Sequence, residues 1–327
     1  MRTAIALGGN AIASESPVTV ARQKARIGET VDAVEALTDR GHELVFTHGN
    51  GPQVGQSLVQ QATADAPERP LHVLVAETQA QIGYLIADQL EGAVDGRIAT
   101  VVTRVRVDPA DPDFDDPSKP VGPYYTAAEA AEKPFETGEV TTPDGDRAYR
   151  RLVPSPEPTA VLETDAIRAL VDGGSTVVCG GGGGVPVVDD GGDAVVGHGG
   201  GDGVVGHGGG DGVVGHGDGD GVDAVVDKDR TTRLVASAVD AECLVMATDV
   251  EYAYRDFGTD DQRPIRETDA ASLRVALEKG EFAAGSMRPK IEACLAFLDD
   301  GGERAVITTP DEIDAAVAGD AGTQIRP

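Results

Sequence analysis

Short apolar segments alternate along this chain with longer segments whose apolar residues recur at helical spacing. Residues 4–7 and 43–47 form two of the short segments, and residues 27–37 carry one helical apolar face between them. The same order follows with a helical pattern over residues 78–90 and a β-branched run over residues 98–107. This alternation predicts an α/β fold, in which an open, mostly parallel central sheet carries helices on both faces.

One segment, residues 108–158, interrupts this alternation. It is dense in proline and aspartate, and only a short patch over residues 126–132 has helical spacing. Irregular stretches of this length inside a compact fold are usually functional lids or protruding subdomains. We therefore expect an irregular segment that protrudes from the main sheet.

The alternation resumes after this segment and continues almost to the end of the chain. The expected elements are a helix from residue 164, strands over 175–179 and 185–188, a two-residue strand at 225–226, a strand over 243–247, helices over 270–279 and 291–298, and a last strand over 305–308.

A nine-residue unit, Val-Val-Gly-His-Gly-Gly-Gly-Asp-Gly, begins at Val195 and recurs at Val204 and, with Asp218 in place of a glycine, at Val213. The unit half resembles the calcium-binding β-roll repeat, so one interpretation is a metal site. Its ligands would be Asp202, Asp211 and Asp220 with His198, His207 and His216. The other interpretation is a flexible loop that grew by duplication, because three solenoid turns rarely bury enough surface to be stable.

The chain is strongly acidic, with 56 acidic and 27 basic side chains among 327 residues and a net charge of −29. Phosphate contacts need local positive charge, so a nucleic-acid-binding surface is not expected. An acidic, lysine-poor surface is typical of adaptation to concentrated salt, where the Debye length shrinks to about 3 Å near 1 M and like charges are screened from one another. The composition therefore predicts a halophilic protein.

Three cysteines, Cys179, Cys243 and Cys294, lie far apart in apolar runs. Their spacing fits neither a disulfide framework nor a zinc site, so they predict small core residues in a reducing compartment. The first apolar segment is too short to be a signal peptide, and no apolar run approaches the roughly 18 residues of a membrane span. We expect a cytoplasmic protein.

Lysine is scarce, and one of only six lysines lies between two aspartates, in Asp227-Lys228-Asp229. A solvated charge cluster would be the simplest interpretation. Val225 and Val226, however, predict a short strand before the triplet, and apolar residues at helical spacing follow it. Such strand-to-helix turns are where open α/β sheets bind ligands, so we interpret Lys228 as a functional residue.

Two glycine-rich turns, Gly8-Gly9-Asn10 and Gly49-Asn50-Gly51, each follow a predicted strand and precede helical sequence. Glycine at such a turn lets backbone amides approach an anion closely, and the helix dipole assists. Neither turn matches the phosphate-loop or dinucleotide-binding pattern, and many turn glycines are purely conformational. Two such turns after neighbouring strands, together with five glycines at residues 180–184, nevertheless predict a shared anion site.

Phosphoryl transfer needs cationic donors that hold the charge on the moving group. Lys228 and Lys290 each lie near a predicted helix start, so ammonium group and helix dipole would reinforce one another. A carboxylate beside a cation stays ionised, so Asp227 and Asp229 would fix the lysine side chains or help to place magnesium rather than act as bases. Because the acidic surface repels magnesium-bound ATP, the site must reverse the electric field locally.

Eight strings carry a family resemblance, among them His-Gly-Asn-Gly-Pro-Gln-Val-Gly at 48–55 and Gly-Ser-Met-Arg-Pro-Lys within the last string. The eight occupy residues 6–11, 48–55, 81–84, 118–123, 153–156, 179–186, 227–229 and 285–293. In this order, and over almost the entire chain, they resemble carbamate kinases, a branch of the amino-acid kinase superfamily.

The resemblance implies the amino-acid kinase fold and the reaction of ATP with carbamate to give ADP and carbamoyl phosphate, with magnesium, in a homodimer. It suggests that the enzyme makes ATP during arginine breakdown. An N-terminal lobe, residues 1–185, would hold carbamate and include the lid at about 108–158. A C-terminal lobe, residues 186–327, would hold the nucleotide and include the repeat loop at 195–221.

The resemblance also implies roles for individual residues. The catalytic residues would be Lys119, Lys228, Asp229 and Lys290, with Lys119 closing over the site from the lid. Carbamate and the moving phosphoryl group would lie among Gly8, Gly9, Asn10, Gly49, Asn50 and Gly51. The nucleotide would contact Asp227, Thr248, Asp249, Val250, Tyr252, Met287 and Pro289. No metal ligands are assigned.

Two features depart from the family pattern. The first glycine turn has no lysine, although many relatives carry one there, and the nine-residue repeat replaces a short link. One alternative is another small-acid kinase of the superfamily, which a lysine in the first turn and the absence of the proline-rich segment would favour, but neither condition holds. The other alternative is a non-catalytic sensor or metal-binding module on this fold, and loss of Lys228 or Lys290 would have suggested a sensor.

Overall fold

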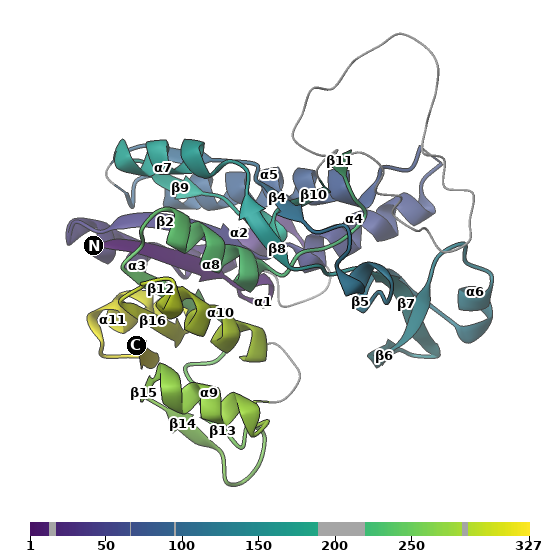
Figure 1. Ribbon diagram of the computed structural model, residues 1–327. Coiled ribbons are helices and arrows are strands. Elements are labelled where there is room, and N and C mark those ends of the chain that lie inside the picture. The colour runs from purple at the N-terminus through teal and green to yellow at the C-terminus, as the bar shows by residue number, and fades with distance from the viewer. Residues whose placement is uncertain (13–17, 66, 95, 189–219, 283–286) are drawn as a thin grey trace.

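The computed structural model describes residues 1–12, 18–65, 67–94, 96–188, 220–282 and 287–327, and an eight-stranded sheet lies at its centre (Figure 1). Across the sheet the strands are β15 (Glu267–Asp269), β17 (Thr323–Arg326), β16 (Arg304–Thr308), β12 (Cys243–Ala247), β1 (Arg2–Leu7), β2 (Glu43–His48), β9 (Thr176–Val178) and β3 (Ile98–Thr100). All neighbours pair in parallel except β16 and β17. The predicted α/β fold with a mostly parallel sheet is confirmed.

The two faces of this sheet bury alternate residues of each strand. In β1, Ala4 and Ala6 belong to one hydrophobic cluster, whereas Ile5 and Leu7 belong to another, as the two-residue period of a strand requires. Helices α7 (Thr164–Asp172), α8 (Lys228–Ala238), α9 (Ala270–Glu278) and α10 (Met287–Asp299) supply the first cluster. Helices α2 (Val20–Gly28), α3 (Val31–Asp39), α5 (Leu71–Leu90) and α11 (Ile313–Ala318) supply the second. Because both faces are covered, the strands are continuous apolar runs, which made them recognisable in the sequence.

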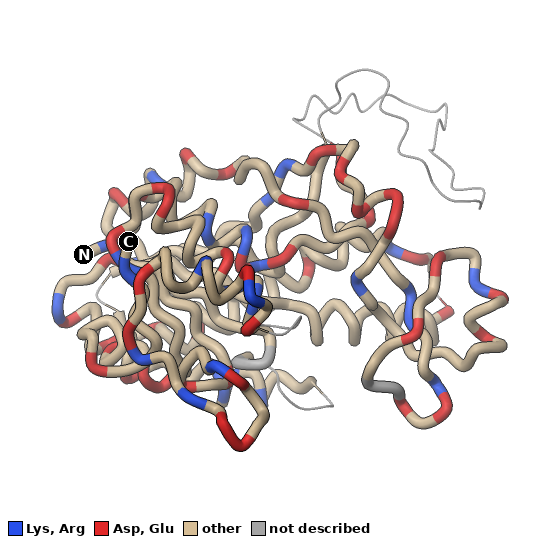
Figure 2. The backbone as a smooth tube through the Cα atoms, turned by 60° about the horizontal axis from the view of Figure 1, so that its bottom comes forward, with Lys and Arg blue, Asp and Glu red and all other residues tan. Residues whose placement is uncertain are grey.

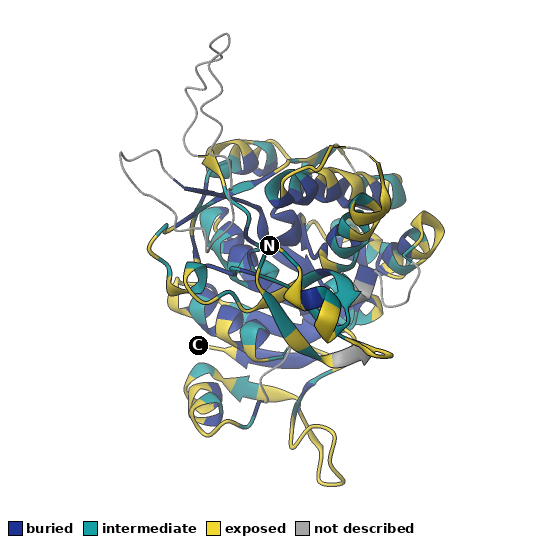
Figure 3. Ribbon diagram, turned by 90° about the vertical axis from the view of Figure 1, so that its right-hand side faces the viewer, coloured by how far each residue is buried: buried dark blue, intermediate teal, exposed yellow. Residues whose placement is uncertain are grey.

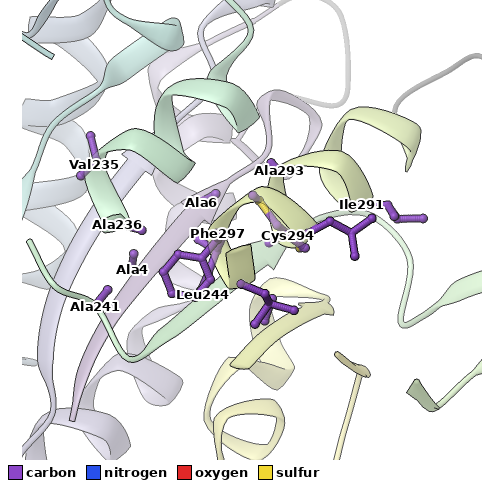
Figure 4. Close-up of a cluster of buried hydrophobic side chains, with 14 of the residues drawn as sticks. Ala4, Ala6, Val235, Ala236, Ala241, Leu244, Ile291, Ala293, Cys294 and Phe297 are labelled. Carbon is purple, nitrogen blue, oxygen red and sulfur yellow. The ribbon is translucent and has the colours of Figure 1, made fainter. Parts of the chain in front are cut away.

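Small side chains line the sheet beneath α8 and α10. Figure 4 shows Ala4 and Ala6 of β1 in one cluster with Ala236 of α8 and with Cys294 and Phe297 of α10. An alanine side chain projects only one carbon atom from the sheet, so both helices can pack close to the sheet and to each other. Their N-terminal turns thereby reach the same edge of the sheet. Figure 3 shows that buried residues concentrate in this central sheet and on the helix faces against it.

A second sheet adjoins the first, with the order β11 (Asp220–Gly221), β10 (Val185–Val188), β4 (Arg104–Val107) and β8 (Pro158–Val161). The expected single strand over residues 98–107 is therefore wrong, because β3 and β4 belong to different sheets. The side chain of Gln79 separates them, since its amide donates to the Thr103 carbonyl (3.0 Å) and its oxygen accepts from the Thr103 amide (3.0 Å). The Thr103 carbonyl also accepts from the Val185 amide of β10 (2.8 Å), so the chain passes from the first sheet to the second at this residue.

The predicted protruding segment contains a third sheet, with antiparallel strands in the order β5 (Lys119–Tyr125), β7 (Arg147–Val153) and β6 (Thr137–Asp144). The helical turn η1 (Pro112–Phe114) precedes it, and α6 (Ala127–Ala131) matches the predicted helical patch. The expectation of an irregular segment is wrong, although the protruding subdomain is confirmed (Figure 1). Pro120 and Pro123 lie on the edge strand β5, where a missing amide hydrogen is tolerated, so the prolines did not exclude a sheet.

Three further expectations are wrong in detail. The helix predicted over residues 27–37 is two helices, because the Thr30 hydroxyl donates to the Ile27 carbonyl (2.7 Å) between α2 and α3. The strand predicted over residues 305–308 is not the last, since η3 (Pro310–Glu312) and α11 lead on to β17. Residues 225–226 form no strand, and the Val225 amide instead donates to the Pro154 carbonyl (3.0 Å).

The remaining elements are α1 (Gly9–Ile12), α4 (Gly51–Thr63), the glycine turn η2 (Gly181–Gly183) and the hairpin β13 (Ala253–Arg255) with β14 (Arg263–Ile265).

The three cysteines are free and buried, as predicted. Of the proposed repeat ligands, only Asp220 lies within the described residues, where it is exposed; His198, Asp202, His207, Asp211 and His216 lie outside them. No helix in the described ranges is both long and apolar enough to span a bilayer.

Candidate active site

The carboxyl ends of β1, β2 and β12 border a cavity of about 1470 Å³, which the N-terminal turns of α4, α8 and α10 and strand β5 also line. Most of the residues proposed from the sequence lie on its lining. They are Gly8, Gly9, Gly49, Asn50, Gly51, Lys119, Asp227, Lys228, Asp229, Thr248, Asp249, Pro289 and Lys290. Residues from both ends of the chain and from the protruding subdomain thus meet in one place.

The two predicted glycine turns touch each other. The Gly8 amide donates to the Ala247 carbonyl (3.0 Å) and the Gly49 amide to the Leu7 carbonyl (3.0 Å), so each turn extends the hydrogen bonding of its strand by one residue. A Cβ atom on Gly49 would lie 2.7 Å from the backbone nitrogen of Gly9. Only backbone fits between the turns, and the helix that begins at Gly51 directs its free amides towards the cavity.

The third glycine segment, residues 180–184, packs against the second turn. Gly182 has a left-handed backbone (φ 62°), and a Cβ atom there would lie 2.1 Å from Nδ2 of Asn50. That nitrogen donates to the Thr78 hydroxyl (3.0 Å), which holds the Asn50 side chain in place. The three glycine segments that were predicted to share an anion site therefore pack directly against one another.

His48, the last residue of β2, is completely buried behind the second turn. Its Nδ1 donates to the Gly49 carbonyl (3.1 Å), so this nitrogen carries a hydrogen. Burial lowers the pKa of His48 to about 4, and the nearby Lys228 ammonium acts in the same direction. The imidazole is therefore neutral at neutral pH and does not add to the positive charge of the site.

Two lysine side chains converge on one buried carboxylate. Lys228 donates to one oxygen of Asp229, and Lys290 Nζ lies 3.2 Å from the other. Asp229 is 3% exposed and Lys290 6%. Burial acts to raise the pKa of Asp229, but the two ammonium groups outweigh it and hold the pKa below its ordinary value. The triad therefore carries two positive charges and one negative charge, and Asp229 is unsuited to accept a proton at neutral pH.

Helix α8 begins directly at Lys228. The Asp227 side chain caps this helix by accepting from the Asp229 amide (2.8 Å), as aspartate commonly does at this position. Its second oxygen lies 3.9 Å from Nζ of Lys119 on the protruding subdomain. Asp227 thus links the helix start to the lid.

The cationic cluster contrasts with the rest of the molecule. Figure 2 shows acidic residues distributed over all parts of the backbone, in agreement with the net charge of −29. At the cavity, three lysines, Lys119, Lys228 and Lys290, gather beside two helix N-termini. An ammonium group and a helix N-terminus both favour an anion, so the arrangement suits a small phosphorylated or carboxylated ligand.

Four predicted site residues are not brought to the cavity by described contacts. Val250 and Tyr252 lie in the turn that follows Asp249, and the Tyr252 hydroxyl accepts from Arg266 (2.8 Å). Met287 packs against the core cluster beneath α10. The backbone of Asn10 lies in α1, and its side chain is outside the described part of the chain.

Sequence reasoning missed two arginines, Arg147 and Arg150, which border the cavity from β7. Their segment was expected to be irregular, so no face could be assigned to them. The available signal was the cluster of three arginines, Arg147, Arg150 and Arg151, within five residues.

Residues 1–309 match the Amino acid kinase family. The chain is 44% identical over 326 residues to a carbamate kinase of Halobacterium salinarum. This match covers 99% of this chain and 98% of the relative. It is 36% identical over 336 residues to a carbamate kinase of Trichomonas vaginalis, covering 100% of both.

Solved structures agree with these sequence matches. Carbamate kinase from Giardia lamblia bound to AMP-PNP superposes with a TM-score of 0.83 at 32% identity, covering 99% of this chain and 98% of the other. An isopentenyl phosphate kinase of T. acidophilum, at 13% identity and a TM-score of 0.51, shares the fold alone.

Proposed function

This chain belongs to the amino acid kinase family, among its carbamate kinases, and we propose that it transfers a phosphoryl group between ATP and carbamate, giving ADP and carbamoyl phosphate. The observation that carries the proposal is the convergence of Lys228 and Lys290 on Asp229, beside the touching glycine turns. Carbamoyl phosphate is an acyl phosphate and a strong phosphoryl donor, so we propose net ATP synthesis, as in arginine breakdown.

The two lysines would stabilise the moving phosphoryl group. Negative charge spreads over its equatorial oxygens in the transition state, and fixed cationic donors stabilise that charge without reorganising. Asp229 holds both ammonium groups on one carboxylate, which fixes their separation before the substrates arrive. We assign Asp229 the role of positioning the lysines, because its lowered pKa makes it a weak base.

The substrates would occupy opposite sides of this pair. Carbamate and the moving group would lie against Gly8, Gly9, Gly49, Asn50 and Gly51, where backbone amides at the start of α4 face the cavity. Thr248, Asp249 and Pro289 line the cavity towards the C-terminal part and would contact the nucleotide. Under this proposal, carbamate would bind in a lobe over residues 1–185 and the nucleotide in a lobe over residues 186–327.

Lys119 would complete the site from the protruding subdomain. It lies 3.9 Å from Asp227 and is half exposed, so its ammonium group can exchange this weak ion pair for a bound phosphate. The protruding subdomain would then act as a lid that excludes water from an acyl phosphate, which water would otherwise hydrolyse.

Magnesium would enter with the nucleotide. No cluster of three or more His, Cys, Asp or Glu suited to a metal occurs in the described part of the chain. Protein-bound magnesium often keeps several waters and uses one or two carboxylates plus substrate phosphates, and Asp227 and Asp249 on the lining fit that role. The ion would supply further positive charge against the phosphates.

A homodimer is consistent with exposed apolar side chains beside the sheet edge. Tyr84 of α5 is 61% exposed and Val102, just after β3, is 43% exposed. Light scattering should give twice the 33.6 kDa mass of one chain.

The activity is tested by ATP formation from ADP and carbamoyl phosphate in molar potassium chloride, with a coupled assay active at that salt. Acetyl phosphate replaces carbamoyl phosphate in a parallel reaction, and the Lys290→Met variant gives the background. We expect carbamoyl phosphate to be strongly preferred. ATP formation no faster than that background would contradict the proposed function.

A further inference from the structure

Two consecutive threonines, Thr231 and Thr232, lie near the start of α8, shortly after Lys228 and Asp229, and both are completely buried. Threonine is a weaker helix former than alanine, and a buried hydroxyl group without a partner costs free energy. An alanine or a valine at either position would avoid the second cost. The two hydroxyl groups therefore need partners, and the structure supplies one for each.

The hydroxyl group of Thr232 joins α8 to the neighbouring strand β2. It donates to the Lys228 carbonyl (2.7 Å), and its oxygen lies 2.6 Å from Oγ1 of Thr47 on β2. A threonine hydroxyl carries a single hydrogen, which here points to the Lys228 carbonyl, so Thr47 is the donor in the bond between the two threonines. Thr47 is completely buried as well. Two successive hydrogen bonds, shielded from water, thus connect the strand with the backbone of Lys228.

The hydroxyl group of Thr231 joins α8 to the third glycine segment. It donates to the Gly183 carbonyl (2.7 Å). A Cβ atom on Gly183 would lie 2.2 Å from the Val226 carbonyl oxygen, so this segment touches the chain just before the helix. A Cβ atom on Gly180 would lie 3.2 Å from Cγ2 of Thr47 and 3.5 Å from Cγ2 of Thr231. The strand, the glycine segment and the helix start therefore pack against one another through these threonines.

The two hydroxyl groups together fix the rotation of α8 about its axis. Consecutive residues of an α-helix project about 100° apart, since the helix has about 3.6 residues per turn. Thr231 and Thr232 accordingly contact different elements, the glycine segment and β2. A single anchor would let the start of the helix turn, whereas two anchors on different sides oppose that motion. Both bonds are neutral, so salt does not screen them as it screens ion pairs.

Lys228 is the residue most sensitive to such a rotation, because it begins the helix and its side chain reaches the cavity. A Cβ atom on Gly49 would lie 3.5 Å from Cδ of Lys228, so the lysine side chain passes the second glycine turn on its way to Asp229. Lysine has a long stem, so a small rotation of the helix start displaces the ammonium group more than it displaces the backbone. A displacement of about 1 Å from the productive geometry can lower a rate about 100-fold.

We propose that Thr231 and Thr232, together with Thr47, are positioning residues for phosphoryl transfer, which hold the start of α8 so that the Lys228 ammonium group faces the moving phosphoryl group. The inference rests on the proposed function. None of the three threonines is among the described residues that line the cavity, so they act through Lys228. Asp229 fixes the ammonium end of the lysine, and the threonines fix its backbone end.

The test uses Thr231→Val and Thr232→Val, which keep the branched shape and remove the hydroxyl group. We expect each to lower kcat at least about fivefold, with the KM values for ADP and carbamoyl phosphate within about twofold of the wild type. Thr232→Ser keeps the hydroxyl group and should restore kcat to within about twofold of the wild type. The control is Thr30→Val, which removes a buried hydroxyl that donates to the Ile27 carbonyl (2.7 Å) between α2 and α3, and it should leave kcat unchanged.

Two combined variants separate positioning from stability. Thr232→Val alone leaves the Thr47 hydroxyl buried without its partner, whereas adding Thr47→Val replaces both partners by apolar groups. The combined variant should regain Tm towards the wild-type value while its kcat stays low. In a Lys228→Met background, Thr232→Val should lower kcat no further, because the group that it positions is absent.

A further measurement needs no turnover. The chain has only six lysines, so isotope labelling of the lysine side-chain nitrogen gives few nuclear magnetic resonance signals, and Lys228→Met identifies the signal of Lys228. The Lys228 side chain is 11% exposed and paired with Asp229, so its ammonium group should give a sharp signal in the wild type and in Thr30→Val. Thr231→Val and Thr232→Val should shift or broaden that signal.

Recovery of wild-type kcat in the combined valine variant would show that the threonines only stabilise the fold. A wild-type kcat and an unchanged Lys228 signal in both single valine variants would also overturn the inference, as would a further loss of kcat in the Lys228→Met background. Failure of the wild type to make ATP would instead refute the proposed function, and the lysine signals would still report on the three threonines.

Discussion

At the scale of single residues, the site depends on how few charges are buried and how they are paired. Asp229 is nearly inaccessible, and it stays ionised because two ammonium groups contact its two oxygens. Removing one member of such a group leaves an uncompensated buried charge, which is more costly than the loss of a surface ion pair. Lys228 and Lys290 should therefore matter for both catalysis and local structure.

We predict that Lys228→Met and Lys290→Met each lower kcat at least about tenfold, because each removes one donor to the moving phosphoryl group. The matched control is Lys279→Met, which removes an exposed lysine at the end of α9. Steady-state kinetics on variants with wild-type circular dichroism would check this. Near-normal turnover in either variant would count against the assignment.

His48 predicts a pH dependence of stability. Its pKa in the folded protein is about 4, below the ordinary value of 6.5, so the unfolded chain binds the proton more readily. The stability that comes from burying neutral His48 is fully present above about pH 6.5 and is lost as the pH falls towards 4. At pH 5 the loss lowers the free energy of unfolding by about 2 kcal/mol. Urea unfolding at pH 7.5 and 5 should show a smaller loss in His48→Gln than in the wild type, and an equal loss would refute this reading.

At the scale of elements, the site forms where strand ends and helix starts coincide. β1, β2 and β12 are adjacent and parallel, so their carboxyl ends and the segments that follow lie at one edge. The glycines after β1 and β2 let these segments touch, and Gly182 fits against Asn50 only because it has no side chain. The backbone amides of the proposed anion site are thus fixed by packing between elements.

Gly182→Ala should destabilise the protein by about 1–3 kcal/mol or more, because alanine is strained at a φ of 62° and its Cβ would collide with Asn50. Gly174→Ala is the control, since its φ is 76° but a Cβ there meets no atom within 4 Å. Chemical denaturation of both variants separates strain from collision. Equal losses in the two variants would mean that the contact with Asn50 contributes nothing.

At the scale of the whole molecule, the net charge of −29 opposes both folding and the approach of anionic substrates. Asp229 is the only buried acidic residue in the described part of the chain, so salt can screen the other acidic side chains, whereas Lys228 and Lys290 at the cavity are largely buried and are screened less. Salt should therefore weaken the repulsion among the surface carboxylates more than it weakens the attraction of the site lysines for anionic substrates.

We predict that activity and the free energy of unfolding both rise with potassium chloride between 0.1 M and 2 M. Most of the rise should occur below about 1 M, where the Debye length has already fallen to about 3 Å. Sodium chloride should act similarly if screening is the cause, and sucrose at equal osmolality provides a non-ionic control. An activity maximum below 0.1 M would contradict the halophilic interpretation.

The sequence by itself determined the α/β fold and the glycine turns, and it singled out Lys228, Asp229 and Lys290 as site residues. These depend on local signals, since buried parallel strands are apolar runs and functional turns interrupt them. Only the tertiary structure decided that both lysines share Asp229 and that residues 108–158 contain a sheet. Such facts depend on which distant segments pack together, and pairing across a half-exposed sheet leaves little trace in the order of residues along the chain.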